Sequence, residues 1–149
     1  MKKNHKIFAL VLVLILLTAI AAWVHLSTRP AIAEGTLQIT VNGKAHTVQL
    51  SALQTKPVSG ERINGKGEVI PVSGQGVLLR DLLVQEKITV HTKVQVMADD
   101  SYTVVLTADE VAADGKAYLL RTDDELRLVV FGDRNSKRSV SNVVQIIIE

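Results

Sequence analysis

Apolar residues form one nearly continuous block near the start of the chain and afterwards alternate with polar residues. The block runs from Ile7 to Leu26 and is interrupted only by Thr18 and His25. A helix of this length rises about 30 Å, which is enough to cross the hydrocarbon core of a bilayer. The pattern therefore predicts an N-terminal transmembrane or signal helix with its linker over residues 1–33, ahead of a working domain over residues 34–149.

The flanks of the apolar block predict its orientation. Lys2, Lys3 and Lys6 precede it, and a cationic end stays in the cytoplasm. Residues 31–33 read Ala-Ile-Ala, the small-x-small pattern that signal peptidases cut. Two outcomes are open: a single-pass membrane protein with an extracytoplasmic domain, or a secreted or periplasmic domain released by cleavage after Ala33. The length of the block favours the uncleaved anchor.

After residue 34 the pattern is that of short β-strands. Asn42-Gly43 follows the first strand and is the strongest short hairpin signal. The last two strands are nearly continuous apolar runs, which predicts central strands buried on both faces. The expected strands cover residues 36–41, 45–50, 93–98, 102–106, 117–121, 126–131 and 143–148, with two shorter strands inside 57–72.

Short helical segments separate some of these strands. Ser51 with Gln54 has the spacing of a weak capping box that would open a single helical turn. Leucines repeat at helical spacing within residues 77–85. Thr107 with Glu110 forms a stronger capping box, which predicts a short helix after residue 107. Together these elements predict an α+β domain in which small helices lie on a mixed or antiparallel sheet.

The charge balance differs between the targeting segment and the domain. The whole chain has 17 basic and 15 acidic side chains. Four of the basic ones and none of the acidic ones lie in residues 1–33, so the domain carries 13 basic against 15 acidic residues, a net charge of −2. No basic stripe remains, which argues against nucleic acid as a partner. The chain has no cysteine, so packing must stabilise the domain without disulfides.

Four segments of the domain, in order and spacing, resemble a known family. They are GVLLRDLL at 76–83, ADDSYTVVL at 98–106, LRLVVFGD at 126–133 and RSVSNV at 138–143. They are similar to the G-V-P-L-x-D-L-L, A-D-G-Y-x-x-x-L, L-R-L-V-V-P-G-D and K-x-V-K-x-V segments of sulfite-oxidase-like molybdopterin-binding domains. The resemblance covers residues 76–149 well and 36–73 loosely. It implies the α+β sulfite-oxidase-like fold for the domain.

The resemblance also indicates what this chain lacks. In the enzymes of the family, a cysteine thiolate between the first helical turn and the G-V-P-L helix binds molybdenum. The corresponding residues 58–74 contain serines and no cysteine; Phe131 replaces the family's proline, and Ser141 replaces a lysine. No catalytic or metal-ligating residue is therefore assigned, and no cofactor is expected, with molybdopterin as the open alternative.

These differences from the family's sequence favour a non-catalytic role, and whether the chain is an enzyme stays open. We expect a membrane-tethered binding or interaction module of molybdopterin-binding-like fold, accessory to an exported redox system. Its expected partners are the membrane, through the N-terminal helix, and a membrane or exported redox protein. The alternative is a divergent molybdopterin-dependent oxidoreductase with a non-cysteine metal ligand.

Three cations form the candidate binding site. Arg134, Lys137 and Arg138 cluster after Gly132-Asp133, in a segment that lies near the pterin phosphate in the family's enzymes. Clustered cations and turn amides suit phosphate or carboxylate. The sequence therefore predicts an anion site for a small ligand at these residues, the alternative being a solvated turn between two strands.

Other polar residues are interpreted as structural. Asp99-Asp100 and the run 123–125 match no calcium-loop spacing and are expected in exposed turns. His46 and His91 are isolated in sequence and are expected on surface strands. Tyr102, which corresponds to the family's A-D-G-Y tyrosine, should pack its ring in a hairpin with its hydroxyl near the surface.

Overall fold

The structure is a computed structural model that describes residues 2–27, 33–89, 91–122, 125–134 and 136–149. The chain divides into two compact units, residues 1–31 and 32–149. The first unit contains a single described helix, α1 (Lys2–Ser27). Within it, Ile7–Val24 is long and apolar enough to cross a membrane, and none of this stretch is buried against protein.

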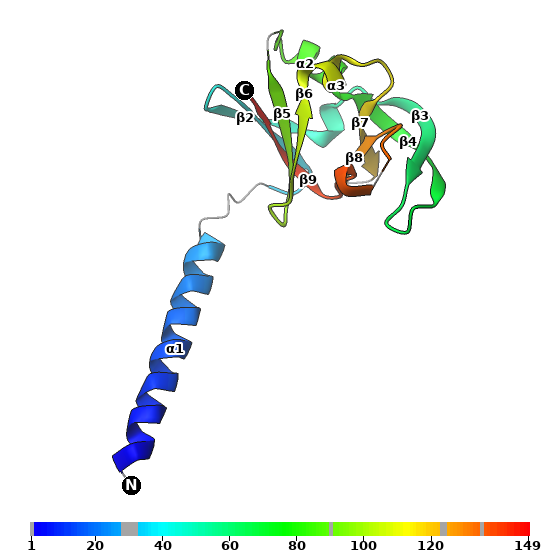
Figure 1. Cartoon of the computed structure of the whole chain (residues 1–149). Helices are drawn as coiled ribbons and strands as arrows, with labels where there is room; N and C mark the ends of the chain where they lie inside the picture. Colours follow the sequence, from blue (N-terminus) through cyan, green and yellow to red (C-terminus); the bar gives the residue numbers. More distant parts are fainter. Residues whose placement is uncertain (1, 28–32, 90, 123–124, 135) are drawn as a thin grey trace. The chain divides into compact units, whose positions relative to one another are not determined.

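The second unit is an α+β domain built from two sheets and short helices (Figure 1). The prediction of the α+β class is confirmed, whereas the prediction of one sheet is wrong. Its elements are β1 (Thr36–Val41), β2 (Lys44–Gln49), η1 (Leu50–Ala52), β3 (Lys56–Ile63), β4 (Val69–Leu78), α2 (Leu79–Gln85), β5 (Lys93–Ala98), β6 (Thr103–Thr107), α3 (Ala108–Ala112), β7 (Ala117–Thr122), β8 (Glu125–Val130), η2 (Ser136–Arg138) and β9 (Val143–Ile148).

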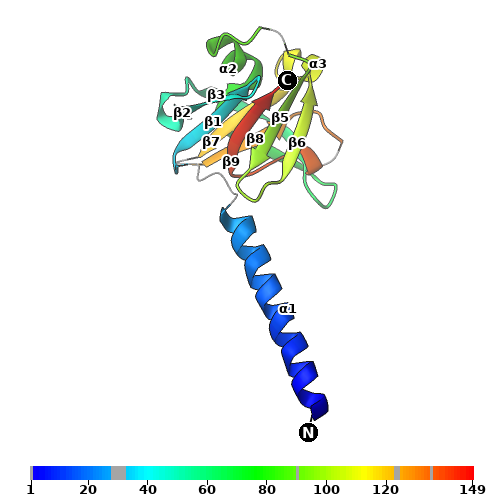
Figure 2. The same ribbon diagram turned by 90° about the vertical axis from the view of Figure 1, so that its left-hand side faces the viewer.

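The larger sheet has the strand order β2-β1-β9-β5-β6. Its strands are antiparallel except for β1 and β9, which run parallel. Figure 2 shows β9 in the middle of this sheet, between β1 and β5. The hairpin β1–β2 turns at Asn42 and Gly43, whose φ angles of 49° and 78° are both positive, as a type I′ turn requires. The sequence prediction of this hairpin is confirmed.

The smaller sheet has the strand order β3-β4-β7-β8, and all its neighbours are antiparallel. Its two outer strands nevertheless come together, because a Cβ placed on Gly60 of β3 would lie 2.6 Å from the ring of Phe131, directly after β8. The sheet is therefore strongly curled. Phe131 also meets Tyr118 of β7 edge to face, with ring centroids 5.6 Å apart.

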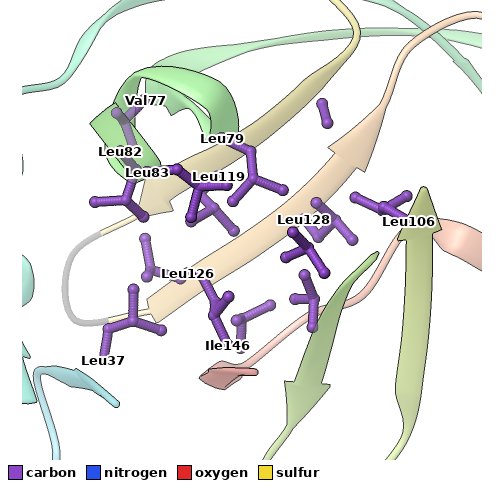
Figure 3. Close-up of a cluster of buried hydrophobic side chains, with 14 of the residues drawn as sticks. Leu37, Val77, Leu79, Leu82, Leu83, Leu106, Leu119, Leu126, Leu128 and Ile146 are labelled. Atoms are coloured by element: carbon purple, nitrogen blue, oxygen red, sulfur yellow. The ribbon is translucent and has the colours of Figure 1, made fainter. Parts of the chain in front are cut away.

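The main core is formed by apolar side chains from both sheets, α2 and α3. Figure 3 shows leucines of α2 meeting side chains from the strands. A second, smaller cluster lies on the other face of the smaller sheet and contains Val58, Leu120 and Val129. Leu119 precedes Leu120 on β7, and Leu128 precedes Val129 on β8. Both leucines point into the main core, because side chains alternate between the two faces along a strand.

Several local predictions need correction. Burial on both faces is present at the end of β8, where Leu128, Val129 and Val130 are all buried. β9 is central as predicted, but β8 is the last strand in its sheet. The turn at Leu50–Ala52 is a 3-10 turn whose N-cap is Gln49, with no side-chain cap. The prediction that Ser51 caps this turn is therefore wrong, because the N-cap position lies two residues earlier, at Gln49.

Candidate functional site

The curl of the smaller sheet leaves a groove of about 490 Å³ between β3 and the turn that follows β8. We call it the β3 groove. At one end Phe131 packs on Gly60, and beyond the other end a Cβ on Gly65 would come 3.9 Å from the hydroxyl oxygen of Ser136. Its lining residues are Ser59, Gly60, Glu61, Arg62, Ile63, Val69, Gly115, Phe131, Gly132, Asp133 and Arg134.

Arg62 is the most informative residue of the β3 groove. Alternation along β3 puts it on the same face as Gly60 and the buried Val58. Its Nε atom is buried and finds no hydrogen-bond partner among the described residues. Because an unpaired buried donor on a charged group costs free energy, this atom is suited to a ligand that supplies an acceptor.

The opposite wall of the groove supplies a second guanidinium. The lining also contains two carboxylates, whose negative charge counts against the binding of an anion. Arg134 is exposed and lines the groove from the turn after β8. Asp133 also lines it, but its two oxygens accept hydrogen bonds from Arg138. Glu61 is exposed and alternates with Arg62 along β3, so it points to the other face. The lining thus carries two cations, Arg62 and Arg134, against Glu61 and an Asp133 that is already paired with Arg138.

Arg138 is the centre of an ion-pair network beside the groove. Its Nε and Nη2 donate to the two oxygens of Asp133 at 2.7 and 2.5 Å, and its Nη1 donates to Oε1 of Glu110 at 2.6 Å. Lys116 lies 3.6 Å from the same Glu110 oxygen. This bidentate geometry is the strong form of a charge-assisted hydrogen bond. The guanidinium thus joins η2 to α3 and to the turn after β8.

The network changes the pKa values of both partners. Hydrogen bonding to Asp133 is the largest influence on Arg138 and, with Glu110, raises its pKa despite partial burial. For Glu110, burial raises the pKa, but the Thr107 backbone amide and the Arg138 guanidinium outweigh it and hold the pKa below its ordinary value. Both groups are therefore held in their charged forms.

The three cations predicted as an anion site occupy different environments. Arg134 borders the β3 groove, whereas Arg138 already holds two carboxylates. Lys137 is exposed, and its backbone carbonyl accepts a hydrogen bond from the Tyr102 hydroxyl at 2.7 Å. Tyr102 is 48% exposed, so its ring is less packed than predicted. Of the predicted trio, the structure places only Arg134 in the groove lining.

The remaining polar candidates are structural or lie apart from the groove. Asp99 and Asp100 form an exposed turn, as predicted, and Asp100 accepts from the Tyr102 amide. Residues 123 and 124 lie outside the described residues. His46 is on β2 and its Nε2 lies 2.7 Å from Glu86. His91 precedes β5, and its ring nitrogens are buried without partners among the described residues, so its predicted place on a surface strand is wrong.

The segment in which the resemblance places a metal ligand forms the regular hairpin β3–β4. Ser59 and Ser73 are directly opposite one another in its ladder, and the ring of Phe131 fills the space above Gly60. This arrangement offers hydroxyl oxygens in place of the thiolate that the resemblance implies. Nor does any group of three or more His, Asp or Glu side chains within the described ranges have metal-site geometry.

Sequence analysis did not single out Arg62, although a signal was present. Val58, Gly60 and Arg62 have the period of a strand face, and a charged residue on the face of a buried valine is unusual. What the sequence could not supply was the contact between Gly60 and Phe131, which are separated by most of the domain. That contact turns a strand face into a groove wall.

No protein-family model matches the chain, and no curated protein matches it.

Proposed function

We propose that this chain is a membrane-tethered, extracytoplasmic binding module of sulfite-oxidase-like fold that holds an anionic group in the β3 groove. The observation that carries the proposal is the pair Arg62 and Arg134, one with a buried unpaired Nε and the other exposed on the facing wall. Arg–carboxylate and Arg–phosphate contacts are strong and directional. The two guanidinium groups would clamp such a group from opposite sides.

The proposed setting follows from α1. The apolar stretch Ile7–Val24 can span a bilayer by length and composition, and the lysines before it favour a cytoplasmic N-terminus. The domain after the linker would then lie outside the cytoplasm, as an accessory to an exported redox system or another membrane complex. The absence of cysteine from the whole sequence favours a binding role over molybdenum chemistry.

Calorimetric titration of the full chain in detergent with inorganic phosphate and a dicarboxylate tests the proposal. We expect saturable binding that is weakened about tenfold or more by Arg62→Gln or Arg134→Gln, the effect of losing one charge-assisted hydrogen bond. Arg127→Gln is the matched control, because Arg127 is an exposed arginine of β8 outside the groove lining. Binding that is absent, or equally weakened by all three substitutions, would overturn the anion site.

The redox alternative has its own measurement. Protein purified from its native membrane can be analysed for molybdenum and pterin by mass spectrometry. A stoichiometric metal content would favour a divergent oxidoreductase with a non-cysteine ligand and would contradict a purely binding role. The control is the same preparation of a variant lacking Ser59 and Ser73, the facing hydroxyls of the hairpin.

A further inference from the structure

Strand β3 borders the groove with its backbone edge as well as with side chains. Five consecutive residues, 59–63, line the groove. Successive side chains of a strand point to opposite faces, so a cavity lined by an unbroken run extends along the edge of the strand. β3 is the outermost strand of the smaller sheet among the described strands. Figure 1 shows the β3–β4 hairpin beside β8 and the segment that follows it.

The register of the hairpin shows which backbone groups face that edge. The Asn64 amide donates to the Glu68 carbonyl, so this pair is a hydrogen-bonded one. Bonded and non-bonded pairs alternate in an antiparallel ladder, which makes Arg62 opposite Ile70 a bonded pair. The backbone N–H and C=O groups of Ser59, Glu61 and Ile63 consequently point away from β4. Three residues thus present the pattern with which a further strand pairs.

From these observations we infer that the β3 groove takes a short, extended, acidic segment of a partner protein, which pairs with β3 as an added strand. Main-chain hydrogen bonds to Ser59, Glu61 and Ile63 supply affinity that does not depend on sequence. Arg62 and Arg134 supply the preference for a carboxylate. The inference rests on the proposed function and deepens it, because it specifies what kind of molecule carries the anionic group.

The two close approaches around the groove limit the length of the bound segment. Phe131 packs on Gly60, and Ser136 approaches Gly65. The residues of β3 that line the groove, 59–63, can pair with only a few residues of a partner, since a strand advances about 3.3 Å per residue. A segment of this length gains modest affinity from backbone pairing alone, so the charged contacts decide which partners bind.

An array of short blocked peptides tests the inference with the full chain in detergent. Every peptide carries glutamate at alternate positions and varied residues elsewhere, and a matched array carries glutamine in place of glutamate. We expect retention on the glutamate array, weakened about tenfold or more by Arg62→Gln and by Arg134→Gln. Arg127→Gln should bind like the parent. Arg134 is exposed, so its variant remains informative if Arg62→Gln does not fold.

A second measurement distinguishes strand pairing from charge attraction alone. N-methylation of alternate amides in the best peptide removes donors on one edge only. Methylation of the edge that faces β3 should abolish binding, whereas methylation of the other edge should leave it unchanged. Equal effects from the two patterns, or no retained peptide at all, would overturn the inference.

Inorganic phosphate separates failure of this inference from failure of the proposed function. Phosphate that binds through Arg62 while every peptide fails would leave the anion-binding module in place and assign it a small ligand. Failure of both phosphate and peptides would overturn both statements.

Discussion

Arg138 donates two parallel hydrogen bonds to the carboxylate of Asp133, one from Nε at 2.7 Å and one from Nη2 at 2.5 Å. The remaining nitrogen, Nη1, donates to Glu110. One guanidinium therefore fixes the turn after β8, the short helix η2 and the start of α3. The same turn carries Arg134 into the groove lining. The relationship explains how this turn can present a binding residue in a defined position.

Arg138→Ala should destabilise the domain by about 2 kcal/mol, because it leaves the partly buried Asp133 without its charged partner and Glu110 with only the longer contact to Lys116. Denaturant unfolding followed by circular dichroism measures the change. Arg134→Ala is the matched control: Arg134 is exposed and borders the groove, so its removal should leave stability within about 0.5 kcal/mol of the parent. Equal stability losses in the two variants would contradict the structural role assigned to Arg138.

Glu110 should make the domain acid-sensitive. Its pKa is lower in the folded state than in an unfolded chain, where a glutamate titrates near 4.3. The stabilisation is thus fully present above that value and is lost as the pH falls through the lowered folded-state pKa. We expect the parent to have a larger free energy of unfolding than Glu110→Gln at neutral pH. This difference should shrink as the pH decreases through the acid range.

Asp109→Asn is the control for this pH dependence. Asp109 is an exposed carboxylate of the same short helix, and Glu110 is the member of that turn that contacts Arg138. The parent should keep its acid-dependent loss of stability in the Asp109→Asn background. If the difference in unfolding free energy between the parent and Glu110→Gln stays constant across the acid range, Glu110 does not stabilise the domain through its charge.

Local features of the fold were predictable from the sequence. The capping box of α3 forms as expected, with the Glu110 amide donating to the Thr107 hydroxyl and the Glu110 carboxylate accepting from the Thr107 amide. The turn at Asn42-Gly43 forms for a similar reason, since both signals depend on residues within one turn of each other. Contacts between residues that are close in sequence form independently of how the rest of the chain folds.

Features that depend on distant contacts were not predictable in the same way. The apolar run of β8 indicated a central strand, because burial on both faces usually has that cause. In this domain the second face of β8 is covered because the smaller sheet curls and brings Phe131 onto Gly60. At the outer edge of β8, Val140 pairs with Leu128. Arg138 was grouped with Arg134 because the two are close in sequence and lie in the segment that the resemblance places near a phosphate, while its partner Glu110 is 28 residues away.

The apolar stretch Ile7–Val24 should hold the protein in the membrane. Carbonate extraction of membranes that contain the full chain should leave it in the pellet, whereas a chain that begins at residue 34 should be soluble with an unchanged thermal midpoint. Leu14→Arg should impair insertion, since a charge at the centre of a spanning helix costs about 3 kcal/mol; Leu14→Val is its control. Release of a soluble product whose N-terminus is residue 34 would instead identify a signal that is cleaved after Ala33.

Gly60 should be intolerant of any side chain. A Cβ there would lie 2.6 Å from the Phe131 ring, whereas a Cβ on Gly74, in the neighbouring strand, would meet nothing within 4 Å. Gly60→Ala should therefore cost about 1–3 kcal/mol through overpacking, and Gly74→Ala should change stability by no more than about 0.5 kcal/mol.

A double-mutant cycle shows whether the curl of the sheet is the cause. Phe131→Leu removes the ring that meets the new methyl group, so Gly60→Ala should cost less in that background than in the parent, with a coupling of about 0.5 kcal/mol or more. Denaturant unfolding of the four proteins supplies the cycle. Independent, additive effects would mean that β3 does not pack against Phe131, and the groove between β3 and the turn after β8 would lose its closed end.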